Sequence, residues 1–141
     1  MSFEAFMKRN KIKKPNTKYV ATKSLVDENG KPLEWEIKAL TTREAEKIRE
    51  ACTIEVPVKG KPGMYRPKLN TDLYTTKMVA AAIVCPDLYN AELQNSYGVA
   101  TPEDLIKEMV DNPAEYMDLV NFVQEYSGFE TMQEKVNEAK N

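Results

Sequence analysis

One stretch of the sequence restricts the fold more than any other: an unbroken apolar run from Met78 to Cys85, closed by Pro86. Eight apolar residues in succession, rich in alanine, are typical of a helix that is covered on most sides. Pro86 disfavours helical geometry at the residue before it and so ends the run. The run has about half the length needed to cross a bilayer. We therefore predict a buried core helix over residues 72–87 of a small domain.

This placement has two consequences for individual residues. Thr71 directly precedes the helix and is expected to cap it. A charged side chain at Ala81 or Ile83 would be buried without a partner, which should cost several kcal/mol of stability.

The residue types exclude most catalytic and metal chemistry. Histidine is absent, and the two cysteines, Cys52 and Cys85, lie far apart, so the commonest general base and most zinc-site arrangements are missing. The chain contains no glycine-rich phosphate loop and no GxSxG or HExxH motif. We therefore expect no enzyme activity, no catalytic residues and no cofactor or metal.

The cysteines and the N-terminus also indicate the cellular compartment. Both cysteines lie in apolar contexts that are expected to be helical, which predicts buried free thiols in a reducing compartment. Basic residues follow the first seven residues directly, so a secretory signal is not expected. We predict a cytoplasmic protein.

Charge is distributed unevenly along the chain. Residues 1–85 hold 17 Lys and Arg against 10 Asp and Glu, a balance of +7, whereas residues 86–141 hold 3 against 12, a balance of −9. The two halves either present partner surfaces of opposite sign or are solvated faces that attract each other. The basic run near the N-terminus lacks interleaved aromatic residues and the whole chain is acidic, so nucleic acid and membranes are not expected partners.

The first segment predicts a short amphipathic helix on a basic tether. Ser2 can cap a helix over residues 3–9, which places Phe3, Phe6 and Met7 on one face. Such a helix docks either on its own domain or on a partner, and we favour docking on its own domain.

Residues 18–40 predict a β-hairpin. The turn is placed at Asn29-Gly30, the pair that a type I′ turn favours. This turn sets a register with the following opposed residues: Val26 and Leu33, Ser24 and Trp35, Thr22 and Ile37, Val20 and Ala39, and Lys23 and Glu36. In this register Trp35 lies on the buried face, and we interpret it as a core residue rather than a binding residue.

The next segment carries signals for a helix, an edge strand and a loop. Thr41 and Glu44 have the spacing of a capping box at the start of a helix. Residues 54–58 alternate apolar and polar residues as a strand, which Pro57 confines to a sheet edge. The basic stretch 59–67, rich in glycine and proline, predicts a flexible loop or a loose hairpin return.

The C-terminal half predicts short helices with clear ends. Thr101-Pro102 and Asn112-Pro113 each place a cap before a proline at the first helical position, and Gly128 is expected to end the second of these helices. A last helix is expected from Phe129 onward. Because strands precede helices, we predict an α+β fold in which a small N-terminal antiparallel sheet, a hairpin plus an edge strand, packs on a C-terminal bundle of short helices.

We expect residues 1–141 to form a single domain with three parts. These are an N-terminal helix and basic tether (1–17), a β-rich half (18–70) and a helical half (71–141).

Four stretches together resemble the XkdN-like tail assembly chaperones of phages and phage-like elements. They are FEAFMKRNKI, DENGKPLEWEIKALTTREAEKIRE, AAAIVCPDLYNAELQNSYGVATPEDLIKEMV and NPAEYMDLVNFVQEYSGF. The resemblance implies a chaperone that binds the tape measure protein and keeps it soluble while the tail tube assembles, and that is absent from the finished particle. The resemblance implies the tape measure protein as a partner and leaves open whether the tail tube protein is a second partner. The sequence leaves open whether the chain forms a homo-oligomer and whether a longer form is made by ribosomal frameshifting.

A chaperone for a long helical client needs adaptable apolar surface, and the chain has seven Met and seven Tyr. We therefore predict helix-in-groove binding in which the acidic half steers basic client segments. The candidate partner-binding residues are Phe3, Phe6, Met7, Tyr116, Met117 and Val120. The alternative for each is a place in the core. Two other functions are kept open: a structural tail adaptor or minor tail component retained in the particle, and a nucleic-acid regulator with a basic tail.

Overall fold

The apolar run changes conformation part way along. In the computed structural model, which describes residues 2–129, helix α2 (Thr71–Ala82) ends at Ala82 and strand β5 (Ile83–Cys85) continues the chain. Ile83 pairs with Ile37, and the Lys38 N–H donates to the Ala82 carbonyl at 2.9 Å. The predicted helix was therefore too long, because the β-branched residues after Ala82 suit a strand and find a strand partner.

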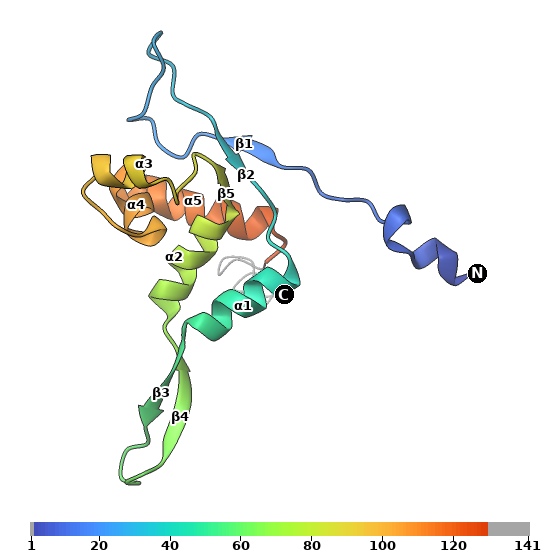
Figure 1. Ribbon diagram of the computed structural model, residues 1–141, viewed down its shortest axis with the longest axis vertical. Coiled ribbons are helices and arrows are strands. Elements are labelled where there is room, and N and C mark those ends of the chain that lie inside the picture. The colour runs from blue at the N-terminus through green and yellow to red at the C-terminus, as the bar shows by residue number, and fades with distance from the viewer. Residues whose placement is uncertain (1, 130–141) are drawn as a thin grey trace, which may run out of the picture.

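The helical part of the prediction is confirmed, with one change at its N-terminus. Asn70, and not Thr71, caps α2, since the Asn70 Oδ1 accepts a hydrogen bond from the Leu73 N–H at 3.2 Å. The helix packs against α1 (Thr42–Ala51), α4 (Pro102–Met109) and α5 (Pro113–Tyr126) (Figure 1). It is thus the element that holds the other long helices together.

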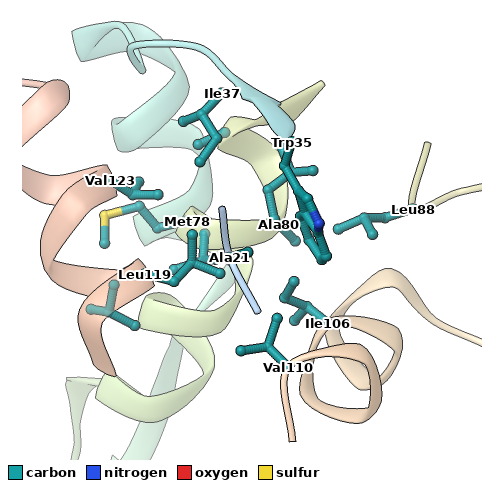
Figure 2. Close-up of a cluster of buried hydrophobic side chains, with 14 of the residues drawn as sticks. Ala21, Trp35, Ile37, Met78, Ala80, Leu88, Ile106, Val110, Leu119 and Val123 are labelled. Atoms are coloured by element: carbon teal, nitrogen blue, oxygen red, sulfur yellow. The ribbon is translucent and has the colours of Figure 1, made fainter. Parts of the chain in front are cut away.

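The core gathers around α2 and combines residues from both halves of the chain. Met78, Val79, Ala80 and Ala82 of α2 are buried there. Figure 2 shows Trp35 next to Ala80 and Leu88 in the same cluster. Trp35 is only 2% exposed, as expected for a core residue.

Three short strands form an antiparallel sheet in the order β1-β2-β5. They are β1 (Thr17–Tyr19), β2 (Trp35–Ile37) and β5. The α+β class is confirmed, since this small antiparallel sheet lies with several helices, although β5 comes after α1 and α2 in the chain (Figure 1).

The predicted hairpin register is wrong. The pairs observed between β1 and β2 are Thr17 with Ile37, Lys18 with Glu36 and Tyr19 with Trp35. The residues predicted to pair with β2 were Thr22, Lys23 and Ser24, and each observed partner lies five positions earlier in the sequence. The predicted pair of Val20 and Ala39 does not form.

The cause of this shift lies in α5, far away in the sequence. The Glu115 carboxylate accepts from the Thr22 hydroxyl at 2.8 Å and from the Lys23 N–H at 2.9 Å. Ala21 is buried in the core. These contacts take residues 20–25 out of the ladder, so that Val26 keeps a single bridge, to Pro32.

The turn also differs from the predicted type I′. A type I′ turn needs a positive φ at both of its central residues. Gly30 has φ +80°, but among the residues described only glycines have a positive φ, so Asn29 does not. Asp27 organises the turn instead: its carbonyl accepts from the Gly30 N–H at 3.0 Å, and its Oδ1 accepts from the N–H groups of Asn29 and Lys31. This is the longer turn in which only the glycine takes the left-handed conformation.

A second hairpin projects from the body of the molecule (Figure 1). The predicted edge strand forms β3 (Thr53–Pro57), but it pairs with β4 (Tyr65–Leu69) in a separate two-stranded sheet. The stretch between them is thus the hairpin return that was one of the two alternatives. Each strand of this hairpin carries one proline, Pro57 and Pro67.

The starts of α1, α4 and α5 agree with the predictions from sequence. Thr41 and Glu44 form the capping box of α1, and Thr101 and Asn112 cap α4 and α5, each followed by its proline. A shorter helix, α3 (Ala91–Ser96), precedes them. The last helix predicted from Phe129 onward lies, apart from Phe129, outside the described residues.

The N-terminal arm, residues 2–13, stands away from the rest of the chain (Figure 1). It holds two 3₁₀ helices, η1 (Phe3–Phe6) and η2 (Lys8–Asn10), in place of the single helix predicted over residues 3–9. Ser2 caps η1 as expected, because its hydroxyl accepts from the Glu4 N–H at 3.1 Å. The prediction that this segment docks on its own domain is wrong: the side chains of Phe3 and Phe6 are 76% and 78% exposed.

Candidate functional site

Three of the predicted contact residues come together in a groove between α2 and α5, here called the α2–α5 groove. Its volume is about 430 Å³. It is lined by Asp72, Thr75 and Thr76 from α2, and by Tyr116, Met117 and Val120 from α5. A groove of this kind between two packed helices is a common place for a ligand or a partner segment to bind.

The position of these α5 residues follows from helical spacing. Residues 116, 117 and 120 lie within one turn and share a face of the helix. Leu119 and Val123 lie on the neighbouring face and are fully buried in the core. The sequence pattern alone does not separate these two faces, since both are apolar.

Hydrogen bonds fix the tyrosine that forms the base of the groove. The Thr76 hydroxyl donates to the Asp72 carbonyl at 3.1 Å, which leaves its oxygen to accept from the Tyr116 hydroxyl at 3.0 Å. Val120 is buried beside it, whereas Met117 is 55% exposed at the rim. The groove therefore has a fixed base and one flexible apolar side chain at its edge.

The α2–α5 groove itself is nearly neutral. Of its lining residues Asp72 is acidic and Lys107 is basic, and the polar amides of Asn121 and Gln124 line its remaining part. Among the described residues of the helical half, Asp72 is the only acidic residue that lines the groove. Its lining indicates apolar binding with a few polar contacts.

A second groove of about 390 Å³ lies where the β3–β4 hairpin meets the start of α2 and is here called the hairpin groove. Asp72 lines both grooves. Ile54 and Val56 lie on one face of the hairpin and line the hairpin groove together with Lys68, which is paired with Ile54. Sequence reasoning missed this extension, although the apolar alternation of Ile54 and Val56 was its signal.

The other three predicted contact residues do not join this site. Phe3, Phe6 and Met7 lie on the N-terminal arm, away from the α2–α5 groove (Figure 1). The six candidates thus form two separate groups. Whether either group binds a partner stays a prediction.

A third hollow, here called the apolar pocket, lies between the residue 25–35 segment and α3. Its volume is about 360 Å³, and its walls are almost entirely apolar. Its lining includes Leu25, Leu33, Trp35, Pro86, Leu93 and Tyr97. Cys85 and Glu34 also line it. Nothing in the sequence pattern marked this pocket, because it depends on the observed hairpin register.

The shifted pKa values belong to structural ion pairs and hydrogen bonds. The hydrogen bond from Lys77 to the Glu103 carboxylate, 3.0 Å long, raises the pKa of Lys77. The hydrogen bond from Lys38 lowers the pKa of Glu44. The Glu44 side chain also closes the capping box of α1. Burial raises the pKa of the Cys52 thiol.

Two searches of residues 2–129 bear on other classes of site. No helix there is long and apolar enough to span a membrane. No group of three or more His, Cys, Asp or Glu residues in that range is placed to hold a metal ion.

Comparison with known proteins gives consistent matches over nearly the whole chain. A family described as phage XkdN-like tail assembly chaperone protein matches residues 3–140. The phage-like element PBSX protein XkdN of Bacillus subtilis (strain 168) is 25% identical over 137 residues, which cover 96% of this chain and 91% of that protein. The uncharacterized protein YqbN of the same strain is 24% identical over 134 residues, covering 95% and 89% of the two chains.

A solved structure has the same fold. The crystal structure of the protein YqbN superposes with a TM-score of 0.77 at 20% identity, covering 92% of this chain and 98% of that chain. The likeness concerns the whole arrangement of elements and not a single motif.

Proposed function

Because the chain belongs to the phage XkdN-like tail assembly chaperone family, we propose that it binds the tape measure protein of a phage or phage-like element and keeps it soluble while the tail tube assembles. The client is a long helical chain with exposed apolar stretches. The chaperone acts in the cytoplasm, without catalysis, and leaves before the particle is complete.

The observation that carries this proposal is the α2–α5 groove and its continuation along the hairpin groove. An amphipathic client helix places apolar residues on one face at every third or fourth position. Tyr116 and Val120 offer a fixed apolar base for that face, and Met117 adapts to its shape. Because the two grooves meet at Asp72, the client lies along α5 and reaches Ile54 and Val56 on the hairpin.

Charge around the grooves supports the choice of client segment. Residues 86–129 hold nine acidic side chains and one lysine. A field of this sign speeds the approach of basic segments and repels acidic ones. We therefore propose that clients are amphipathic helices whose polar faces are rich in lysine and arginine.

The test is co-expression of this chain with overlapping fragments of the tape measure protein from the same element. The fragments should remain in the soluble fraction and co-purify with the chain, and fragments that carry basic amphipathic helices should be retained best. Equal solubility with and without the chain, with no co-purification, would show that the proposal is wrong.

A matched pair of methionine variants locates the site. Met117 at the rim of the α2–α5 groove and Met64 at the tip of the β3–β4 hairpin are 55% and 53% exposed. Met117→Glu should reduce client retention at least tenfold, whereas Met64→Glu should leave it unchanged, because neither groove includes Met64. Equal loss in both variants would place the client elsewhere.

Analysis of purified tails separates a chaperone from a retained tail component. The proposed function predicts that the chain is absent from assembled tails that contain the tape measure protein. Its recovery in a fixed ratio to the tail tube protein, measured by mass spectrometry, would support the structural adaptor instead.

A further inference from the structure

We propose that the N-terminal arm of one copy of this chain docks in the apolar pocket of a second copy, so that the protein associates with itself by exchange of arms. The contact uses the rings of Phe3 and Phe6 on one side and the pocket beside Trp35 on the other. It does not use the α2–α5 groove, and it holds whether or not the client is a tape measure protein.

The arm has a defined shape that is suited to docking. In a 3₁₀ helix, side chains three positions apart project on the same side, so Phe3 and Phe6 form one aromatic surface on η1. The Ser2 cap and a hydrogen bond of 2.7 Å from the Asn10 side-chain amide to the Glu4 carbonyl hold this segment together. Two largely exposed phenylalanines on an ordered segment are an apolar surface in need of a partner.

The apolar pocket matches this surface in chemistry and size. Its walls are Leu25, Leu33, Trp35, Leu93 and Tyr97, and its volume of about 360 Å³ falls in the range of pockets that take aromatic groups. Leu33 at its edge is 42% exposed, so the pocket is open to another chain.

Charge complementarity favours a second copy as the occupant. Residues 2–14 carry five basic side chains and one acidic, a balance of +4, whereas residues 86–129 carry a balance of −8. Among the described residues, the one charged residue that lines the pocket is Glu34. The basic part of an incoming arm therefore meets an acidic half as its phenylalanines enter the pocket.

The position at which the arm joins the body explains why the arm docks on another copy of the chain. The Lys14 ammonium donates to the Tyr126 carbonyl at 2.5 Å and lies 4.1 Å from the centroid of the Tyr126 ring, and the Tyr126 hydroxyl donates to the Pro15 carbonyl. The arm thus starts at the C-terminal end of α5.

The pocket lies toward the opposite end of that helix. Leu25 of the pocket follows closely on Thr22 and Lys23, which bind Glu115 in the first turn of α5. A helix of this length spans about 20 Å, and a fully extended chain from Lys14 back to Phe6 reaches about 29 Å at most. An arm that docked in its own pocket would have to run back along α5 in an extended form, whereas in the structure it runs away from the body (Figure 1).

Cys85 provides a direct test, because its exposed thiol lines the pocket. One chain carries Ala5→Cys and Cys85→Ser, which adds a thiol to the arm and keeps both phenylalanines. It is mixed with a size-tagged chain of natural sequence under mild oxidation. A disulfide between position 5 of the first chain and Cys85 of the second, identified by peptide mass, is the expected product and forms only between copies.

The control replaces the arm thiol by one on the tether. Ile12 is 94% exposed, and Ile12→Cys with Cys85→Ser should give at least a tenfold lower yield of the mixed disulfide. Equal yields would show random collision and overturn the proposal. So would a single chain with Ala5→Cys and intact Cys85 that forms only an intramolecular disulfide, since the arm would then occupy its own pocket.

Sedimentation measures the association without any new thiol. The double variant Phe3→Ser/Phe6→Ser should raise the dissociation constant of self-association at least tenfold. Leu33→Lys in the pocket should do the same, whereas Leu73→Lys, at a similarly exposed leucine on α2, should not. A natural chain that stays monomeric at every concentration, or whose association is unaffected by both the arm and the pocket variants, would overturn the proposal.

Discussion

The ring of Tyr19 stacks on the ring of Phe122, with the two centroids 4.2 Å apart and the ring planes inclined by 18°. Phe122 also stacks with Tyr126 at 5.9 Å, and the Lys14 ammonium lies over the Tyr126 ring. These side chains form one continuous row along α5. The row attaches β1 to the helical half and determines where the N-terminal arm leaves the body.

Phe122→Ala should destabilise the fold by about 2–3 kcal/mol, because it removes a half-buried ring together with its stacking contacts. The free energy of unfolding in urea measures this loss. Met117→Ala on the same helix removes an exposed side chain and should change stability by less than about 0.5 kcal/mol. Similar values for both variants would mean that the aromatic row contributes little.

A charge in α2 should be tolerated or rejected according to its position. Ala80 is 4% exposed in the core, so Ala80→Asp should cost about 3 kcal/mol or more. Ala81 is only partly buried, in a surface hollow lined by Lys47 and by the ion pair of Lys77 and Glu103, so Ala81→Asp keeps access to solvent and should cost less, about 1–2 kcal/mol. Thermal unfolding of the two variants compares them directly. This revises the large penalty expected from sequence at Ala81, whereas Ile83 is buried as expected.

Glu115 should make stability depend on pH in the acidic range. The Lys23 N–H and the Thr22 hydroxyl bind its carboxylate and hold its pKa below the ordinary value of 4.5. The folded state therefore binds this proton less readily than the unfolded state, so the stabilisation is present above about pH 4.5 and is lost as the pH falls through the lowered pKa.

Glu115→Gln should lower stability at neutral pH and flatten the loss of stability in acid. Urea unfolding at a series of pH values measures both effects. Glu125→Gln, near the other end of α5, is the control for removal of one negative charge from the helix. If Glu115→Gln has the same acid profile as the natural chain, the contact does not contribute to the pH dependence.

The two cysteines should differ sharply in reactivity, contrary to the expectation that both are buried. Cys85 lies exposed in β5, whereas Cys52 is buried and its pKa is raised by burial. A thiol reagent should therefore modify Cys85 rapidly and Cys52 only after unfolding. Mass analysis during the reaction, with Cys85→Ser as the reference, measures both rates. Rapid modification of Cys52 in the folded chain would contradict its burial.

The features predicted correctly from the sequence are those decided within a few residues. A cap and the proline after it act inside one helical turn, which is why Thr101 and Asn112 were placed correctly. The capping box of Thr41 and Glu44 is equally local. The order of strands and helices then gave the α+β class.

The features predicted wrongly depend on contacts between distant residues. The hairpin register follows from the contact of Thr22 and Lys23 with Glu115, which lies in the other half of the chain. The end of α2 at Ala82 depends on the partner strand β2. The local preference for a long helix was outweighed by this tertiary contact. The type I′ turn was replaced for a local reason, since the Asp27 side chain binds the N–H groups of Asn29 and Lys31.

The candidate site divides in the same way. Tyr116, Met117 and Val120 were named together from the sequence and do share the α2–α5 groove, although the pattern did not distinguish this face of α5 from the buried face of Leu119 and Val123. The hairpin groove requires the pairing of β3 with β4, and the apolar pocket requires the shifted register beside Trp35. The first pairing was one of two alternatives that the sequence left open, and the second depends on the contact of Thr22 and Lys23 with Glu115.

The two prolines of the β3–β4 hairpin affect whether a strand of another chain can pair with its outer edges. The Val58 N–H donates to the Met64 carbonyl at 2.9 Å, so this is a hydrogen-bonded pair at the end of the ladder. Hydrogen-bonded and non-hydrogen-bonded pairs alternate along antiparallel strands. The next pair, Pro57 with Tyr65, is a non-hydrogen-bonded pair, and so is the pair two positions further on, Glu55 with Pro67. Both prolines therefore lie where the backbone groups point outward, away from the partner strand.

Each outer edge of the hairpin thus lacks one amide donor that an added strand would need. A ribbon that extends into solvent is usually a template on which extended segments accumulate into cross-β aggregates. This ribbon is protected against that outcome on both sides. Its edges are therefore poor templates for the addition of an extended segment from another chain.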